Sequence, residues 1–302
     1  SPEEYRKAPG GYIPDLAFRI VGGERDGSFE PMVVAARNAQ QAVGRQQPLD
    51  EQIEWRITRA LAWAKLHRAA NADKKVVLTY WSEAGGKSDV GGDPDDFLDV
   101  QGTLAMLLPA MRERGYNVGK GALPDAETLA QRMAREASNM GNWAPGEIAK
   151  RVAESNPILI PEAEYSEWFN AIPEQRRKEI EAVWGPAPGK TMIYTNAQGQ
   201  RFIVIPRIEY GNVLIAPHPM WGYLENQKAL LSREALPPHH QYLAFFLWLQ
   251  KKWHADAWVS LFTNIVLQPG NVQGPLADDH IGILLGGLPH IHPERLGANG
   301  GT

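Results

Sequence analysis

The sequence contains no cysteine among its 302 residues. This absence excludes disulfide bonds, thiolate metal sites and a cysteine nucleophile. It is consistent with a reducing compartment, and we expect a cytoplasmic protein. Any metal chemistry must therefore use histidine, carboxylates or a bound cofactor.

Long apolar runs and a strong charge of one sign are also missing. The longest uninterrupted apolar stretch, residues 242–249, is far shorter than the ~20 residues that cross a bilayer, so we expect no membrane-spanning segment. Lys and Arg total 31 against 35 Asp and Glu, which gives a formal charge of -4. Because no long basic run can neutralise a phosphate backbone, nucleic acid is not an expected partner.

Several enzyme motifs are absent as well. Gly86, Lys87 and Ser88 resemble the end of a phosphate-binding loop, but the first glycine of that motif is missing in the region of Trp81. We therefore expect no ATP to bind to this chain. The sequence also lacks the serine-hydrolase elbow, the zinc-binding pair of histidines and the Rossmann glycine fingerprint.

Alternating apolar strands and helices predict an α/β fold. The hydrophobic content of 43% is sufficient for a sizeable core in one or two domains. Residues 75–81 are rich in β-branched and aromatic side chains, and a Gly-rich loop and a helix over residues 99–114 follow them. Residues 115–118 end this helix and begin a further strand. The pattern predicts mostly parallel sheets that are flanked by helices.

The rest of the chain predicts a helical middle section, a β-hairpin and a second α/β unit. The expected helices cover residues 125–140, 145 onward, 173–184 and a buried 242–253; the expected strands cover residues 193–195, 201–205, 212–216 and 257–262. Asp50 is the expected N-cap of a surface helix in which Ile53, Ile57, Leu61 and Ala64 recur at helical spacing. We place the two domains at residues 1–165 and 166–302.

The Gly-rich loop after the strand at residues 75–81 is one candidate binding segment, because open α/β sheets bind ligands at such positions. Its candidate residues are Glu83, Lys87 and Asp93. The acidic residues of the loop do not follow a calcium-loop spacing. A solvated loop is the better interpretation of that acidic group.

Histidines near the end of the chain are the other candidates. His218, His239, His240, His290 and His292 account for five of the eight histidines. Imidazole is a common metal ligand and a frequent ligand of haem iron, although a single histidine is more often a hydrogen-bonded structural residue. Trp81, Trp221 and Trp258 lie at strand ends or in loops, where a planar ligand can stack.

An ordered series of motifs resembles the large porphyrin-binding subunit of the cobaltochelatases and magnesium chelatases. The matching segments are residues 76–114, 168–173 with 184–185, 211–213, 218–223 and 238–242. The resemblance covers nearly the whole chain and implies the central fragment of a much longer subunit. It further implies a tetrapyrrole as ligand or substrate, a divalent metal, and separate ATPase subunits as partners.

The sequence departs from this family at one place. After the last predicted strand, family members carry a histidine and a glutamate that are candidates for metal delivery or porphyrin deprotonation. Phe262 and Val266 occupy the aligned positions, and neither side chain can accept a proton or bind a metal. A variant group in this family accompanies bacterial haem uptake and is implicated in removing iron from haem, which fits a family scaffold with a rebuilt site.

Two classes of function follow. The first is an enzyme subunit that removes a metal from haem or a related tetrapyrrole, or inserts one. The second is a noncatalytic tetrapyrrole carrier or scaffold. The residues expected to contact the tetrapyrrole are His218, Trp221, His239, His240, Phe262 and Val266, with His218 and His240 as metal ligands and Arg207 near a propionate.

Overall fold

The computed structural model describes residues 34–37, 45–82, 92–93, 98–141, 145–220, 237–261 and 279–291. Its centre is a five-stranded sheet in the order β12-β11-β3-β10-β9. The strands are β3 (Val76–Tyr80), β9 (Ile208–Tyr210), β10 (Val213–Pro217), β11 (Ala257–Leu261) and β12 (His290–Ile291). All neighbouring pairs are parallel except β9 with β10. The predicted α/β class with a mostly parallel sheet is confirmed.

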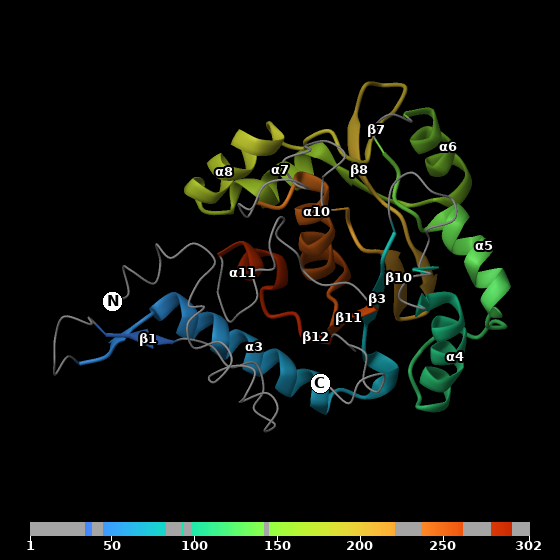
Figure 1. Cartoon of the computed structure of the whole chain (residues 1–302), viewed down its shortest axis with the longest axis horizontal. Coiled ribbons are helices and arrows are strands. Elements are labelled where there is room, and N and C mark those ends of the chain that lie inside the picture. Colours follow the sequence, from blue (N-terminus) through green and yellow to red (C-terminus); the bar gives the residue numbers. More distant parts are fainter. Residues whose placement is uncertain are drawn as a thin grey trace.

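Successive strands of the chain are added to the sheet first on one side of β3 and then on the other. The chain passes from β3 to β10 on one side, then returns past β3 to β11 and β12 on the other. Connections that reverse in this way place their helices on opposite faces of the sheet. Figure 1 shows α4 and α5 on one side of the central strands and α10 and α11 on the other.

The two faces of the sheet bury different residues, because side chains alternate along each strand. Val76, Leu78 and Tyr80 pack with α4 (Val100–Glu113) and α5 (Ala126–Glu136). Val77 packs with α7 (Glu162–Asn170) and α10 (His240–Trp248). All five residues of β3 are buried, as expected for a central strand that is covered on both faces.

The buried helix of the last third is confirmed, with a different start and a different end. α10 begins at His240, and the chain continues as a π-helical turn, η4 (Leu249–Trp253). His239 caps the helix, because its Nδ1 accepts a hydrogen bond from the Tyr242 amide at 3.2 Å. His254 ends the turn in the left-handed region with φ 56°.

The middle of the chain contains the predicted helices and hairpin. β7 (Ile193–Thr195) and β8 (Arg201–Ile205) form the hairpin, and β6 (Ile158–Pro161) adds a third antiparallel strand in the order β6-β8-β7. Asn196 stabilises the turn, since its Oδ1 accepts from the amides of Gln198 and Gln200. The predicted helices in this region are α5, α6 (Pro145–Ser155) and α8 (Glu174–Trp184), and α7 is a further helix that was not predicted.

Two local expectations are wrong. Residues 115–118 form no strand; the chain leaves α4 through Gly115, whose φ is 81°. In α3 (Asp50–Arg68) the N-cap is Leu49, so that Asp50 is already helical. The remaining elements are β1 (Ala35–Ala36), β2 (Gln47–Pro48), η3 (Asn71–Asp73), β4 (Gly92–Asp93), β5 (Leu98–Asp99) and α11 (Asp279–Leu285).

Helix α3 lies on the surface, as expected, but it faces the protein with polar residues. Gln52 and Arg59 are buried, whereas Ile57 and Leu61 are 54% and 66% exposed. Trp55 Nε1 donates to Gly286 O at 2.7 Å. Arg59 donates to Leu288 O at 3.0 Å. The helix therefore docks on the segment after α11 through backbone carbonyls.

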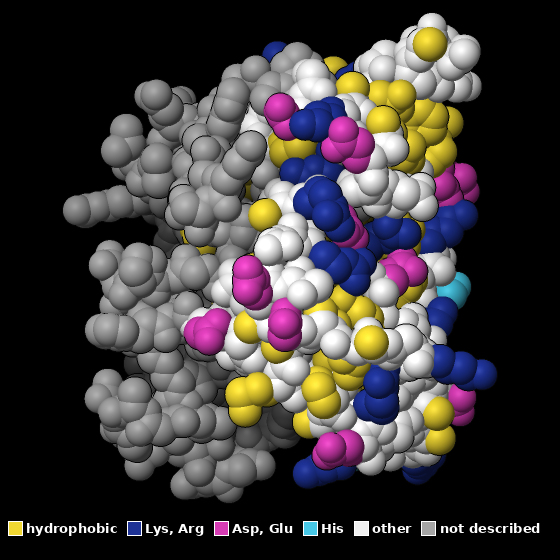
Figure 2. All heavy atoms as spheres, turned by 90° about the vertical axis from the view of Figure 1, so that its right-hand side faces the viewer, with side chains coloured by type: hydrophobic (Ala, Val, Ile, Leu, Met, Phe, Trp, Pro, Cys, Tyr) yellow, Lys and Arg dark blue, Asp and Glu magenta, His cyan; other side chains and the backbone are white. Residues whose placement is uncertain are grey.

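The outer face over α4 to α6 carries charges of both signs. Figure 2 shows a band of Lys and Arg side chains interspersed with Asp and Glu. Arg132 and Glu136 illustrate the mixture, with an ion pair at 2.9 Å. No helix in the described ranges is long and apolar enough to cross a membrane. The division into residues 1–165 and 166–302 remains a prediction, and the central sheet contains strands from both parts.

Candidate functional site

The carboxyl ends of β3, β10 and β11 define the candidate site. In open α/β sheets, ligands bind outside these ends at the point where the strand order reverses. Here that point lies between β3 and β11. His218 follows β10 directly, and its amide donates to Tyr80 O at the end of β3 at 2.8 Å.

The predicted site residues divide into three groups. His218, His239 and His240 lie in the described part of the chain, and each is only 2% exposed. Asp93 ends the short strand β4, where only the backbone is described. Glu83, Lys87, Trp221, Phe262 and Val266 lie outside the described residues.

His218 is held between the sheet and α10. Its Nδ1 lies 2.9 Å from Pro219 O, so Nδ1 carries the proton and donates to that carbonyl. Nε2 is then an acceptor, and the Tyr242 hydroxyl lies 3.2 Å away from it. This second bond is long for an O–H donor. Among the ring nitrogens of His218, His239 and His240, Nε2 of His218 therefore has the weakest hydrogen bond.

His239 and His240 each use both ring nitrogens. His239 caps α10 through Nδ1 and donates from Nε2 to Met220 O at 2.5 Å. His240 donates from Nε2 to Gly185 O at 2.8 Å, so its Nδ1 accepts from the Tyr165 hydroxyl, also at 2.8 Å. These bonds tie the start of α10 to Tyr165 within α7, to the end of α8 and to the segment after β10. Both imidazoles have a structural role in this arrangement.

Burial keeps these histidines neutral. It lowers the pKa of His218 to about 4, against a smaller opposing effect of the bond to Pro219 O. It likewise lowers the pKa of His239 to about 4. The pKa of His240 is also lowered, mainly by burial. A neutral imidazole is the form that binds a metal, so protonation does not prevent coordination near pH 7.

The ring of Trp258 stacks between the imidazoles of His218 and His290. Its ring centroid is 3.8 Å from that of His290 and 5.9 Å from that of His218. Its Nε1 donates to Thr79 Oγ1 at 2.7 Å. Since Trp258 is fully buried, its faces are occupied by protein groups. Trp258 therefore packs against His218 and is not available for the stacking on a planar ligand that the sequence had indicated.

The structure does not bring the histidines to one metal centre. No cluster of three or more His, Asp or Glu side chains suited to a metal occurs among the residues it describes. His218 faces Tyr242, whereas His240 packs on Tyr165 and Phe169. The assignment of His218 and His240 as metal ligands remains a prediction.

A cavity of about 290 Å³ adjoins His239 and His240. Trp184 forms part of its wall, and its Nε1 donates to Pro237 O at 2.7 Å. Gly189 also lines it, with φ 75°, and a Cβ at that position would lie 2.8 Å from His240 Cδ2. Only glycine fits there without displacing the imidazole. The volume is at the lower end of the range for small-molecule pockets, so an entire tetrapyrrole does not fit.

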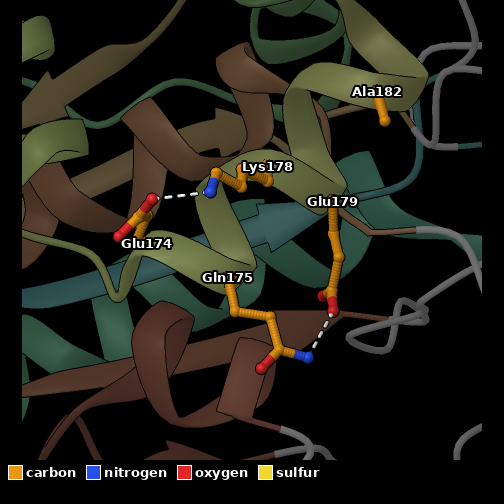
Figure 3. A pocket seen from close by; sticks show the side chains of 5 residues that line it. All are labelled: Glu174, Gln175, Lys178, Glu179 and Ala182. Carbon is orange, nitrogen blue, oxygen red and sulfur yellow. Dashed lines mark hydrogen bonds and ion pairs between the residues drawn. The ribbon is translucent and has the colours of Figure 1, made fainter.

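A second hollow of about 510 Å³ follows the outer face of α8. Figure 3 shows that its polar side chains pair with one another: Lys178 with Glu174 at 2.6 Å, and Gln175 with Glu179 at 3.2 Å. The drawn side chains thus leave no unpaired charge for a ligand. We do not assign a site there.

Sequence reasoning missed the residues that join the strand ends. Asn139, which follows α5, donates from Nδ2 to Ser82 O at 2.9 Å and to His218 O at 2.7 Å. It thereby links the ends of β3 and β10. A single asparagine after a helix gives no periodic or motif signal, so its position could be found only in the fold.

Comparisons with known proteins agree with this architecture. The family model described as CobN/Magnesium Chelatase matches residues 1–294. The magnesium-chelatase subunit ChlH of Oryza sativa is 28% identical over 294 residues, which cover 96% of this chain and 20% of that protein. The aerobic cobaltochelatase subunit CobN of Pseudomonas aeruginosa is 26% identical over 283 residues, which cover 93% and 21%.

A solved structure has the same fold. The catalytic subunit of cobaltochelatase from Mycobacterium tuberculosis superposes with a TM-score of 0.70 at 26% identity, over 97% of this chain and 24% of that one. The chain thus spans about a fifth to a quarter of the length of these relatives. Because the family model covers nearly every residue, the chain belongs to the CobN/magnesium chelatase family.

Proposed function

We propose that this chain is part of a tetrapyrrole-binding large subunit that removes a metal from haem or a related tetrapyrrole, or inserts one. The observation that carries the proposal is the match of the family model to residues 1–294. By the resemblance of the motifs, Phe262 and Val266 would stand where family members carry a histidine and a glutamate. The scaffold supports tetrapyrrole binding. The two apolar side chains favour a site different from that of ordinary metal insertion.

The tetrapyrrole would lie at the carboxyl ends of the parallel strands. Trp221, Phe262 and Val266 follow β10 and β11 in the sequence and would supply an apolar wall. His218 is the best candidate for an iron ligand, because its Nε2 has only the 3.2 Å contact with the Tyr242 hydroxyl to lose. Glu83 and Lys87 follow β3 and would face the same edge.

His240 is a weaker candidate for a metal ligand. Coordination through Nδ1 would leave the Tyr165 hydroxyl without its partner, and coordination through Nε2 would do the same to Gly185 O. Either loss inside the core costs roughly 1–3 kcal/mol. We assign His239 and His240 to the support of the site, where they hold the start of α10 beside it.

The proposal includes partners. Lys87 lies in an incomplete phosphate loop, so ATP hydrolysis would belong to separate ATPase subunits. A divalent metal, iron in the case of haem, would be substrate or product. The remaining part of a longer polypeptide would complete the subunit, and the location would be cytoplasmic.

A noncatalytic carrier or scaffold is the second candidate. The observation that favours it is that His218, His239 and His240 are all buried and hydrogen-bonded within the chain. Phe262 and Val266 likewise offer no base. In this case the tetrapyrrole would bind and leave unchanged.

Incubating the full-length protein with haem and a reductant distinguishes the two candidates. Removal of the metal releases Fe²⁺ and requires two protons, which the pyrrole nitrogens take up. Free Fe²⁺ together with the fluorescence of metal-free porphyrin would support the enzyme. A shifted Soret band without either product would support the carrier, and no spectral change would contradict tetrapyrrole binding altogether.

Haem titrations of single variants test the role of the histidines. His218→Ala should change the Soret band and weaken binding. His239→Ala and His240→Ala should act mainly by lowering stability. Unchanged spectra and affinity in all three variants would contradict the histidine assignment.

A further inference from the structure

A polar cluster with incomplete hydrogen bonding lies beside the carboxyl ends of the central strands. Ser138 and Asn139 follow α5, and Asn139 is fixed to the ends of β3 and β10 through Ser82 O and His218 O. Arg151 of α6 reaches the same segment, where its Nη2 donates to Ser138 Oγ at 3.1 Å. The cluster is thus attached to the strand ends that define the candidate site.

Two atoms of this cluster are buried without a hydrogen-bond partner: Arg151 Nη1, a donor, and Asn139 Oδ1, an acceptor. Buried polar groups in native proteins are nearly always paired, so such atoms call for a specific explanation. The Arg151 group also carries a full charge. Burying a charge without a partner is much less favourable than burying a neutral polar group.

Among the residues that the structure describes, no neighbouring group neutralises Arg151. Burial is the largest effect on its pKa, which is lowered, and the attraction of Glu147, Glu154 and Glu136 opposes this only in part. None of these carboxylates is in an ion pair with Arg151 among the described residues. Glu136 is already paired with Arg132 and Arg135.

The other candidates for a counter-charge are also insufficient. The Tyr80 hydroxyl donates to Ala137 O, and burial raises the pKa of this phenol far above its ordinary value, so it stays neutral. The carboxyl end of α5 offers at most about half of a negative charge. The described part of the chain therefore supplies no full negative charge next to Arg151.

Arg207, which the sequence suggested as a propionate partner, is in the opposite situation. Its Nε is paired with Glu209 at 2.7 Å, and its Nη1 donates to Asn156 O at 2.6 Å. This guanidinium already has an anionic partner. The geometry distinguishes the two arginines: Arg207 contacts Glu209, whereas Arg151 has an unused buried donor and contacts no carboxylate among the described side chains.

We infer that Arg151 binds a carboxylate side chain of the tetrapyrrole, with Ser138 holding the guanidinium in place. This inference rests on the proposed function. Arginine is suited to the role because its planar donors match the two oxygens of a carboxylate. Nη1 is buried in the unliganded chain, but Arg151 as a whole is only partly buried, so that rotation of its side chain can present Nη1 to the ligand.

The test compares a porphyrin that has two free propionates with its dimethyl ester. Both are titrated into the full-length protein and followed by absorbance and by quenching of tryptophan fluorescence. The wild-type protein should bind the diacid about tenfold more tightly than the diester, as expected for one charge-assisted hydrogen-bonded pair. Arg151→Gln should lower affinity for the diacid to that for the diester and leave the diester unaffected; Arg151→Lys should retain part of the preference.

Arg135→Gln is the matched control, because Arg135 lies on neighbouring α5 and is paired with Glu136 at 2.5 Å. It should keep the full preference for the diacid. Unfolding supplies a second readout: removal of a buried, unpaired charge by Arg151→Gln should leave the midpoint of urea denaturation unchanged or raise it. A purely structural arginine would give a lower midpoint.

The results of these titrations test the inference about Arg151 separately from the proposed function. If Arg151→Gln keeps the preference for the diacid, or the wild-type protein has no such preference, the inference about Arg151 is wrong while the proposed function stands. If the wild-type protein binds neither porphyrin, the proposed function fails and the inference fails with it.

Discussion

The two faces of the central sheet differ in the kind of side chain that they bury. The face toward α4 and α5 is mainly aliphatic, with Leu104, Leu108 and Leu129 fully buried together with the ring of Tyr80. The face toward α10 buries Trp258, Tyr242 and Phe246 together with the ring of His218. The first face consists mainly of aliphatic packing, whereas the second packs aromatic rings against the imidazole of His218 near the strand ends. Changes on the two faces should therefore differ in their effect on ligand binding even where they destabilise equally.

Replacing Trp258 should give the largest effect. Trp258→Ala removes a fully buried ring and the hydrogen bond to Thr79, so we expect a loss of roughly 3–5 kcal/mol of unfolding free energy by urea denaturation. Leu104→Ala on the aliphatic face should cost roughly 2–5 kcal/mol. Only the Trp258 variant should also weaken tetrapyrrole binding by the full-length protein. Equal affinities in the two variants would remove the distinction between the faces.

Lowering the pH should destabilise the aromatic face selectively. His218 and His239 have a pKa of about 4 in the folded chain, against an ordinary value of 6.5. Above pH 6.5 both states are neutral and stability is complete. As the pH falls from 6.5 towards 4, the unfolded chain takes up protons that the folded chain refuses, so each histidine removes up to about 1.4 kcal/mol per pH unit.

Urea denaturation at a series of pH values measures this loss, and His239→Gln provides the comparison. The variant should be less stable near pH 7 but should show a shallower decline below pH 6.5. A wild-type stability that is constant between pH 6.5 and 4.5 would contradict the neutral, buried assignment of these imidazoles.

A smaller effect should follow from removing one hydroxyl. Tyr165→Phe leaves Nδ1 of His240 as a buried acceptor without a donor, which should cost about 1–2 kcal/mol. Tyr210→Phe is the matched change on the other side of the sheet. The Tyr210 hydroxyl contacts the partly exposed Arg132, which can bond to water instead, so little stability should be lost. Equal losses in thermal or urea denaturation would count against the difference in burial.

The smallest effect is expected outside both faces. Arg135→Gln breaks an ion pair whose arginine side chain is 61% exposed. Such pairs contribute about 0–1 kcal/mol, and we expect a change within about 0.5 kcal/mol in the same denaturation assay. A larger change would mean that the outer surface of α5 takes part in the support of the sheet.

Apolar runs made much of this fold predictable from the sequence. β3, β11 and α10 were expected within a few residues of their observed bounds, since nearly every residue of the three elements is buried. The hairpin of β7 and β8 followed from Asn196 and Gly199 in its turn. These signals are local, because each depends on the residues of one element.

The failures concern partners that lie far away in the sequence. Residues 115–118 were expected to begin a further strand, but they form none, and the neighbours of β3 are β10 and β11. Helical spacing in α3 emphasised Ile57 and Leu61, yet the helix contacts the protein through Trp55 and Arg59, which donate to backbone carbonyls. Bonds to a distant backbone leave no pattern in the sequence of the helix that makes them.

The same limit applies to the candidate site. The histidines in the last third of the chain could be recognised as a group from the sequence. His218, His239 and His240 of this group are buried in the structure. Their hydrogen bonds to Pro219, Met220 and Gly185 carbonyls could not be foreseen. Asn139 and Arg151 were missed for the same reason, since their importance depends on what the fold places beside them.

The central position of β3 has a consequence for biosynthesis. Both of its neighbours, β10 and β11, are synthesised more than a hundred residues later, so β3 leaves the ribosome with both hydrogen-bonding edges unpaired. Sheets of such high contact order form slowly, and exposed strand edges promote aggregation in the meantime. Nascent chains truncated before residue 213 should therefore depend on chaperones, and protection of β3 from protease should begin only once β11 has emerged.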